Sequence, residues 1–274
     1  MATVVVTGAS GFVGRYLTAY LASCGFNVTP VSRRPSAGMF AVQDYSQCPP
    51  GDALVHLAEE PNRGKVNRLG AQYVIESAIV VKALSSRFRQ SMIYASSGMV
   101  YGDQNESPCR IGTPIAGTDV YSCSKLRNEQ IVLEAGGAVA RLSNLIGIGM
   151  ATNNVISDII HQIFGSGSLH VRDDRPVRDF LSVSDATAGF GALVESEFRG
   201  IVNIGSGVGT SVRALAELAL GIAGQQDRTI IATEPSCRRS INVLDITETS
   251  KALGWAPVRS LKSQLSELLC NIAM

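Results

Sequence analysis

Several features are scarce in this sequence, and each scarcity excludes a class of protein. Its 274 residues carry 24 Lys and Arg against 23 Asp and Glu, a net charge of +1 with no block of one sign. We therefore expect no nucleic-acid partner. No apolar run reaches roughly 18 residues, so we expect no membrane partner. The N-terminal segment lacks the basic stretch and cleavage site of a secretory signal, which favours a cytoplasmic location.

Cysteine pairs of the metal-binding or redox kind are also missing. The six cysteines form no C-x-x-C pair, and their spacing to the three histidines matches no metal site. We expect reduced thiols and no metal. Apolar residues, by contrast, make up 45% of the chain, which is enough for a large core. This content excludes a disordered chain or a small disulfide-stapled scaffold.

Short β-branched runs alternate with longer helical stretches over roughly the first 145 residues. The expected strands are 3–7, 27–32, 53–57, 91–96 and 138–142. The expected helices are 12–24, 66–86 and 121–135. This order predicts an α/β fold with a Rossmann-type, doubly wound parallel sheet, whose ligands bind at the carboxyl ends of the strands.

The pattern loosens after residue 145. We interpret the Gly- and Ser-rich residues 165–168 and the charged run 172–178 as loops, and residues 260–270 as a closing helix. A helix at 183–196 and a strand at 201–204 are able to return to the main sheet. We therefore predict a main domain of residues 1–145 and 178–204 and a smaller C-terminal lobe of residues 146–177 and 205–274.

A glycine-rich turn follows the first expected strand. Gly8, Gly11 and Gly14 have the spacing G-x-x-G-x-x-G and open a helix. Glycine is needed there because a Cβ would keep the backbone away from a pyrophosphate, and the helix points its positive end at that anion. The turn predicts a dinucleotide site rather than a purely structural turn. The expected cofactor contacts in it are Gly8, Ser10, Gly11, Phe12, Val13 and Gly14.

The end of the second expected strand indicates which dinucleotide is bound. The acidic residue that would accept hydrogen bonds from ribose is replaced by Ser32, and Arg33 and Arg34 follow. A carboxylate would repel a 2′-phosphate, whereas a hydroxyl and guanidinium groups would bind it. We therefore expect NADP rather than NAD as cofactor. The alternative is that both arginines are solvated surface charges and that the site takes NAD.

A catalytic pair is expected on the helix that begins near residue 121. Tyr121 and Lys125 are four residues apart, so they lie on one face about one turn from each other. A nearby Lys⁺ favours phenolate and makes tyrosine a better proton shuttle at neutral pH. Ser97, at the end of the fourth expected strand, could bind the reacting oxygen, and Ser96 competes for that role. Without this context, the spacing would indicate only an ordinary helix face.

These motifs resemble the extended short-chain dehydrogenases/reductases, specifically the NAD(P)-dependent epimerase/dehydratase family that acts on nucleotide sugars. Short matches in the family's order extend the resemblance over nearly the whole chain. The matching segments are 55–58, 67–70, 96–102, 141–147, 177–185, 203–207 and 253–257. The resemblance implies that the main domain binds NADP and the C-terminal lobe binds substrate.

The resemblance also implies roles for single residues. Leu57 and Ala58 lie along the cofactor, and Tyr121 and Lys125 contact it as well. The Val-Tyr-Gly of residues 100–102 assigns the catalytic hydroxyl to Ser97. The residues implied to bind a nucleotide-sugar substrate are Ser97, Asn144, Arg178 and one of Arg238 and Arg239, with Arg238 as the candidate. Arg178 is implied to hold the diphosphate, and its alternative role is a surface or inter-lobe ion pair.

The sequence departs from the family's pattern at two places. Gly98 and Met99 follow Ser97 at the positions where the family's dehydratases carry an Asp-Glu pair, so we do not expect dehydration. Val120 replaces a proline that often precedes the tyrosine, so the resemblance does not define the shape of the substrate pocket.

The resemblance leaves two reactions, and the catalytic residues are the same for both. The first is NADPH-dependent reduction of a nucleotide-linked 4-keto sugar, with Tyr121 as proton donor. The second is 4-epimerisation of a nucleotide sugar with a tightly held NAD(P). The arginines after Ser32 favour the reductase, and the presence of Tyr121 and Lys125 argues against an NADP-binding regulator without activity. The family also implies a homodimer formed through helices 66–86 and 121–135.

Overall fold

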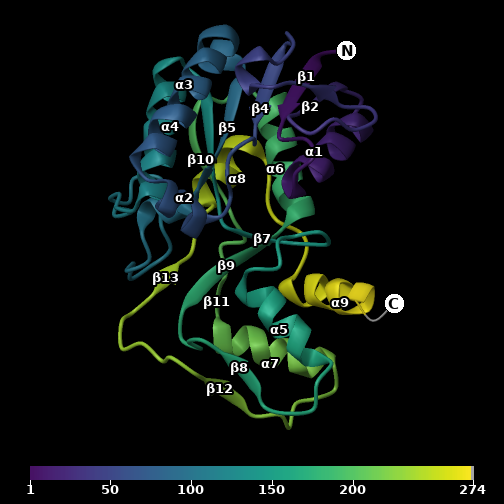
Figure 1. The fold of residues 1–274 in the computed structure, drawn as a ribbon, viewed down its shortest axis with the longest axis vertical. Coiled ribbons are helices and arrows are strands. Elements are labelled where there is room, and N and C mark those ends of the chain that lie inside the picture. Colours follow the sequence, from purple (N-terminus) through teal and green to yellow (C-terminus); the bar gives the residue numbers. More distant parts are fainter. Residues whose placement is uncertain (273–274) are drawn as a thin grey trace.

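The computed structural model describes residues 1–272, and its centre is a seven-stranded parallel sheet (Figure 1). The strand order is β10-β6-β5-β4-β1-β2-β3. The strands are β1 Thr3–Thr7, β2 Asn27–Ser32, β3 Phe40–Ala41, β4 Ala53–His56, β5 Met92–Ser97, β6 Ala138–Leu142 and β10 Gly200–Ile204. The predicted Rossmann-type fold is confirmed, and each strand predicted for this sheet forms within one residue of its expected bounds.

Helices cover both faces of this sheet. Helices α1 (Phe12–Ser23) and α6 (Val183–Glu195) pack on one face, and α3 (Ala71–Phe88) and α4 (Val120–Glu134) pack on the other. Successive strand residues point to opposite faces, so Val4 and Val6 join the core under α1 and α6 while Val5 joins the core under α3 and α4. A parallel sheet buried on both faces requires such continuous apolar strands.

The helix expected at 66–86 is interrupted, and this part of the prediction is wrong. Gly70 has a φ of 67° and ends α2 (Arg63–Leu69), after which α3 begins at once. A positive φ is open to glycine at little cost, so the chain turns sharply there without losing its helical pattern on either side. The kink places the short α2 beside the start of α4.

A smaller set of elements forms the other end of the elongated molecule (Figure 1). A second sheet joins β11, β9 and β13, with β7 also paired to β9, and β8 pairs with β12. These strands are β7 Asn144–Ile146, β8 Leu169–Val171, β9 Val177–Ser182, β11 Gly209–Ser211, β12 Ile230–Ala232 and β13 Ile241–Asn242. The helices at this end are α5 Val155–Ile163, α7 Val212–Ile222 and α9 Leu261–Ile272. Helix α8 Thr247–Leu253 lies at the main sheet beside β10 and α6 (Figure 1). The 3-10 turns η1 Tyr45–Gln47 and η2 Arg89–Ser91 lie beside α3, and η3 Gly98–Tyr101 lies beside α4.

The loops and the helix predicted for this end form in part. Residues 165–168 form a loop and the closing helix forms as α9, as expected. The charged run 172–178 is not entirely a loop, because Val177 and Arg178 open β9. Neighbouring strands on both sides pair with β9, and those pairings overcome the run's low strand propensity.

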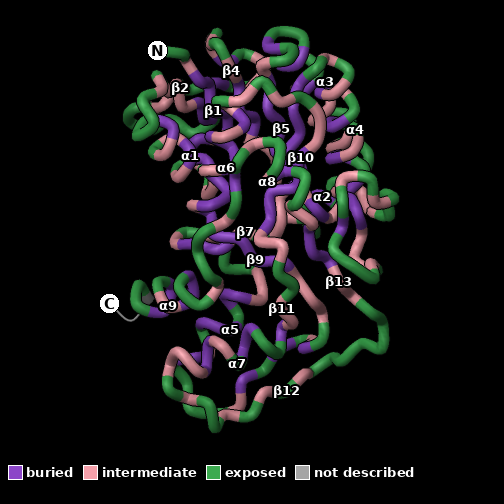
Figure 2. Tube along the Cα trace, turned by 180° about the vertical axis from the view of Figure 1, so that it is seen from behind, coloured by how far each residue is buried: buried purple, intermediate pink, exposed green. Residues whose placement is uncertain are grey.

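Each end has its own apolar core. Residues of α5, α7 and α9 form one cluster with β8 and β9, separate from the clusters on the main sheet. Buried stretches run through both ends, and the segment around β12 is largely exposed (Figure 2). Trp255, which the predicted division assigns to the C-terminal lobe, packs in the core of the main sheet. The division at residues 145, 178 and 204 stays a prediction. Within residues 1–272, no helix is long and apolar enough to cross a bilayer.

Candidate active site

The carboxyl ends of β1, β4 and β5 bring the expected site residues to one edge of the sheet. Thr7 lies beside His56 and His56 beside Tyr94 in the parallel register. The segments that leave these strands therefore start side by side, and they carry the glycine turn, Leu57 and Ala58, and Ser97. Ligands of such sheets bind where the strands end, so this edge is the binding site that the fold predicts.

The glycine turn is shaped so that only glycine fits. Gly8 has a φ of 74°, and a Cβ there would lie 3.0 Å from the backbone of Ala58. A Cβ at Gly14 would lie 2.2 Å from the carbonyl oxygen of Gly8. Helix α1 begins at Phe12, and no side chain caps its first N–H groups. A narrow turn with open N–H donors at a helix start fits the pyrophosphate of a dinucleotide.

The end of β2 shows how the expected 2′-phosphate residues are arranged. The hydroxyl of Ser32 is buried, lies 2.8 Å from the hydroxyl of Ser10 and accepts a hydrogen bond from the backbone N–H of Arg34 at 3.0 Å. Ser32 thus fixes the turn, while Arg33 and Arg34 are exposed. The guanidinium of Arg33 lies 5.3 Å from the ring centre of Tyr45, which sequence reasoning did not identify.

The start of α4 is held by contacts from α2. Asp119 caps the helix by accepting a hydrogen bond from the backbone N–H of Ser122, and it also forms an ion pair with Arg63. The side chain of Asn67 accepts a hydrogen bond from the backbone N–H of Tyr121 at 3.0 Å and donates one to Asp119 at 2.9 Å. These bonds fix the direction of the first turn, which carries Tyr121.

Tyr121 and Lys125 are brought together as expected. The Nζ atom of Lys125 lies 5.9 Å from the ring centre of Tyr121 and donates a hydrogen bond to the carbonyl oxygen of Ala95 on β5 at 2.8 Å. Tyr121 is partly exposed, whereas Lys125 is buried. The pair therefore presents a phenol to the site and keeps the ammonium behind it.

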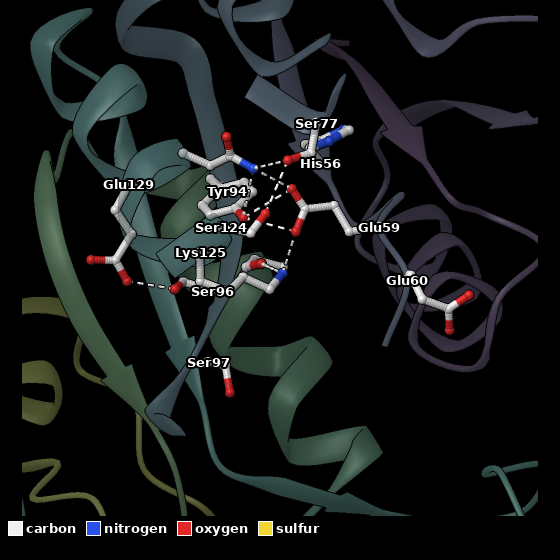
Figure 3. Close-up of polar contacts among 12 residues, drawn as sticks. His56, Glu59, Glu60, Ser77, Tyr94, Ser96, Ser97, Ser124, Lys125 and Glu129 are labelled. Atoms are coloured by element: carbon white, nitrogen blue, oxygen red, sulfur yellow. Dashed lines mark hydrogen bonds and ion pairs between the residues drawn. The ribbon is translucent and has the colours of Figure 1, made fainter. Parts of the chain in front are cut away.

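Lys125 has an acidic partner that sequence reasoning missed. Its Nζ lies 2.6 Å from a carboxylate oxygen of Glu59, directly after Leu57 and Ala58 (Figure 3). Burial disfavours the ammonium most strongly, but the charge and hydrogen bond of Glu59, together with the nearby tyrosines, raise the pKa of Lys125 above its ordinary value. The one signal in the sequence was an acidic residue directly after a buried strand.

The two serines at the end of β5 have different surroundings. Ser96 is buried and donates a hydrogen bond to Glu129 (Figure 3). Glu129 also forms an ion pair with Arg141 at 2.6 Å. Ser97 is partly exposed, and its hydroxyl accepts a hydrogen bond from the backbone N–H of Met99 at 3.2 Å. The hydroxyl hydrogen of Ser97 is left to donate to a ligand, whereas that of Ser96 is engaged.

The residues expected to bind a diphosphate gather around one carboxylate, that of Asp103. Arg238 donates a hydrogen bond to it at 2.7 Å, and a guanidinium nitrogen of Arg178 lies 3.8 Å away. Ser240 bridges them, because its hydroxyl accepts from Arg178 at 2.7 Å and donates to Asp103 at 2.8 Å. Burial and then the charges of Arg238 and Arg63 lower the pKa of Arg178 against the pull of Asp103. The arrangement concentrates positive charge, and sequence reasoning did not identify Arg63 or Asp103.

Asn144 and Arg239 lie outside this group of contacts. Asn144 is exposed at the start of β7 and donates a hydrogen bond to the carbonyl oxygen of Asp179 at 3.1 Å. Arg239 is exposed and donates to the carbonyl oxygen of Glu106 at 3.3 Å. Of the two candidate arginines, Arg238 is therefore the one that shares a carboxylate with Arg178.

Comparisons with known proteins agree with this geometry. The model of the NAD dependent epimerase/dehydratase family matches residues 4–205. The GDP-6-deoxy-D-mannose reductase of Pseudomonas aeruginosa is 30% identical, over 97% of this chain and 95% of that protein. The dTDP-6-deoxy-L-talose 4-dehydrogenase (NAD(P)(+)) of Kitasatospora kifunensis is 26% identical, over 97% and 94%.

A solved structure gives the same result for the fold. The structure of RMD from Pseudomonas aeruginosa complexed with NADPH superposes with a TM-score of 0.85 at 27% identity, covering 99% of this chain and 98% of that one. The resemblance expected from the motifs is thereby confirmed, and so is the enzyme class. The chain belongs to the NAD-dependent epimerase/dehydratase family of extended short-chain dehydrogenases/reductases.

Proposed function

We propose that this protein is an NADPH-dependent reductase of a nucleotide-linked 4-keto sugar. Tyr121 and Lys125, at the ends of β4 and β5, would serve reduction and epimerisation alike. The observation that carries the reductase is the end of β2, where Arg33 and Arg34 are exposed and no carboxylate stands, an arrangement that favours a coenzyme drawn from the NADPH pool. The 30% identical relative named as a GDP-6-deoxy-D-mannose reductase supports the same reaction class.

The chain's own residues would supply orientation and a proton. NADPH, when bound, supplies the hydride that reduces the carbonyl carbon. Ser97 would donate a hydrogen bond to the carbonyl oxygen, and Tyr121 would transfer its phenolic proton to that oxygen as the alcohol forms. Lys125 would stabilise the phenolate that is left, until the solvent restores the proton. The sum of the reaction is ketone plus NADPH plus H⁺ to alcohol plus NADP⁺.

The preference for NADP rests on the end of β2. Ser32 holds a turn that carries two exposed arginines and no carboxylate. We expect Arg33→Ala to weaken NADPH by about 10-fold or more, because a charge-assisted hydrogen bond to the 2′-phosphate is lost, while NADH changes little. Fluorescence titration with each coenzyme measures this difference, and equal weakening of both would contradict the assignment.

The substrate's diphosphate is proposed to bind where the arginines gather. Arg178 and Arg238 already share the carboxylate of Asp103, and both would gain a bidentate anion partner. Asn144, exposed at the start of β7, is proposed to contact the nucleotide sugar. Dehydration is not proposed, because Gly98 and Met99 stand after Ser97 and offer no acid or base.

The reductase is tested by cofactor consumption. The purified protein is incubated, with and without NADPH, with a panel of nucleotide sugars and their 4-keto derivatives, with Tyr121→Phe as control. Oxidation of NADPH in step with alcohol formation is the expected result. Interconversion of 4-epimers without net NADPH oxidation would replace the reductase by the epimerase, and turnover by neither route would contradict both.

Three further expectations remain proposals. We propose a homodimer through α3 and α4, which border a groove of about 860 Å³ and expose Ile75 and Ile79. A monomer in sedimentation equilibrium would contradict it.

We also propose the division into an NADP-binding domain and a substrate-binding lobe. A cytoplasmic location is proposed from the six cysteines, all free thiols in the structure, and labelling of intact cells by an impermeant thiol reagent would contradict it.

A further inference from the structure

A buried carboxylate lies against the amino group of Lys125. Glu59 has 8% of its side chain exposed and approaches Nζ of Lys125 to 2.6 Å. The hydroxyl of Tyr94 lies 3.0 and 2.9 Å from its two oxygens, and the side-chain amide of Asn128 donates to it at 2.6 Å. Contacts from β5 and α4 thus hold the carboxylate in one place (Figure 3).

Glu59 supplies the negative charge that faces this ammonium. The other titratable groups that face it are His56 from β4, Tyr73 from α3, Tyr94 from β5 and Tyr121 from α4. Burial lowers the pKa of His56 to about 4, so it is neutral at neutral pH. Burial, with Glu59, raises the pKa of Tyr73 to about 12 and that of Tyr94 well above its ordinary value. His56, Tyr73 and Tyr94 are therefore uncharged at neutral pH.

We propose that Glu59 is a positioning residue that fixes Lys125 behind Tyr121 and, by offsetting its charge, sets the pH at which Tyr121 ionises. The inference rests on the proposed function only for the role of Tyr121 as proton donor. Glu59 itself touches neither Tyr121 nor Ser97 among the contacts of the described residues.

The geometry explains both effects. An ammonium has three N–H donors, and those of Lys125 go to Ala95 on β5 and to Glu59, which leaves one for a ligand at the nucleotide-binding edge. In Glu59→Gln, the ammonium keeps its bond to Ala95, and wherever it is protonated no carboxylate offsets its charge. A phenolate next to an unbalanced positive charge is stabilised, so Tyr121 should ionise at lower pH.

The first measurement uses the whole chain without ligands. The absorbance of phenolate is recorded against pH for each protein and for its Tyr121→Phe counterpart, and the difference isolates Tyr121. We expect Glu59→Gln to move the midpoint of this difference to lower pH by about one unit. The alkaline limb of NADPH oxidation should move in the same direction, because reduction needs the phenol. A midpoint that stays in place or rises would overturn the proposal.

Glu129→Gln is the matched control, because it also removes a buried carboxylate, one that belongs to α4 and is paired with Arg141 instead of Lys125. We expect it to cost stability and to leave the midpoint in place, and an equal shift in both variants would overturn the assignment to Glu59. If Glu59→Gln does not fold, Glu59→Asp is used, which keeps the carboxylate but places it farther from Lys125. We expect it to move the midpoint in the same direction by a smaller amount. An unmoved midpoint in Glu59→Asp would also overturn the proposal. The absorbance measurement needs no substrate, so it decides this inference even if NADPH oxidation is never observed.

Discussion

Helix α4 contributes Lys125 and Glu129, one turn apart, to two buried ion pairs that differ in their surroundings. Lys125 and Glu59 approach to 2.6 Å with side chains 10% and 8% exposed, and Arg141 and Glu129 approach to 2.6 Å with 5% and 4% exposed. Distance and burial therefore do not separate them.

The neighbours of the two pairs do separate them. Glu129 also accepts from Ser96, and Arg141 lies 4.8 Å from the ring centre of the buried Tyr101, so this pair faces only the interior. Lys125 instead borders the partly exposed Tyr121. Two ion pairs of equal length and similar burial therefore differ in role: the one at Arg141 stabilises the fold, and the one at Lys125 borders the side chain proposed to transfer the proton.

The largest effect is expected from breaking the interior pair. Arg141→Met leaves Glu129 buried without its cation and should lower the free energy of unfolding by about 3–5 kcal/mol. The change is measured by urea denaturation. Turnover of the folded fraction should remain close to that of the parent protein.

A double variant sharpens this prediction. Arg141→Met with Glu129→Leu removes both charges and should recover most of the lost stability, because an apolar pair of similar volume often replaces a buried ion pair without net cost. A double variant as unstable as Arg141→Met would show that the charge left on Glu129 is not the cause.

The next effect separates the functional pair from the structural one. Tyr121→Phe should lower NADPH oxidation at least about 100-fold, or about 2.7 kcal/mol in barrier, because proton transfer contributes on that scale. Coenzyme affinity and the urea midpoint should remain nearly unchanged, since the hydroxyl is at a partly exposed position. An unchanged rate would remove Tyr121 from the mechanism and erase the difference between the two pairs.

The smallest effect concerns the acid stability that Glu59 provides. Burial opposes its carboxylate most strongly, but Lys125, with His56 and the hydrogen bond from Tyr94, holds the pKa of Glu59 below its ordinary value. A carboxyl lowered in this way stabilises the folded protein above its unfolded value of about 4.3, and the contribution is lost as pH falls through the folded value. The parent protein should therefore lose stability more steeply than Glu59→Gln below about pH 4.3. Parallel acid-unfolding curves would contradict this.

Local signals predicted the fold well. Strand β1 carries the apolar run 4–6 and β6 the apolar run 138–140, and the sheet buries both runs, so their sequence and their environment agree. Gly70 did not reveal its break, because the apolar helical pattern continues on both sides of it. The start of β9 could not be predicted from its charged sequence, because Arg178 is in a strand only through pairing with β11 and β13, which lie far along the chain.

Some features of the site could be predicted from local sequence, and others could not. The glycine turn and the Tyr121–Lys125 spacing depend on residues close in sequence, so a short motif carries them. Glu59 and Asp103 act through partners far along the chain, and only the folded structure brings those partners together. The choice of Ser97 over Ser96 came from family resemblance, and the contact of Ser96 with Glu129 now supplies a physical reason for it.

We propose that a redox dinucleotide lies over the glycine turn with its nicotinamide facing Tyr121. A crystal structure of the protein with NADPH tests it most directly. We predict the pyrophosphate at Gly8 to Gly14, the 2′-phosphate on Arg33 or Arg34, and the nicotinamide ring beside the hydroxyl of Tyr121. A nicotinamide ring placed away from that hydroxyl in a fully occupied complex would contradict the account.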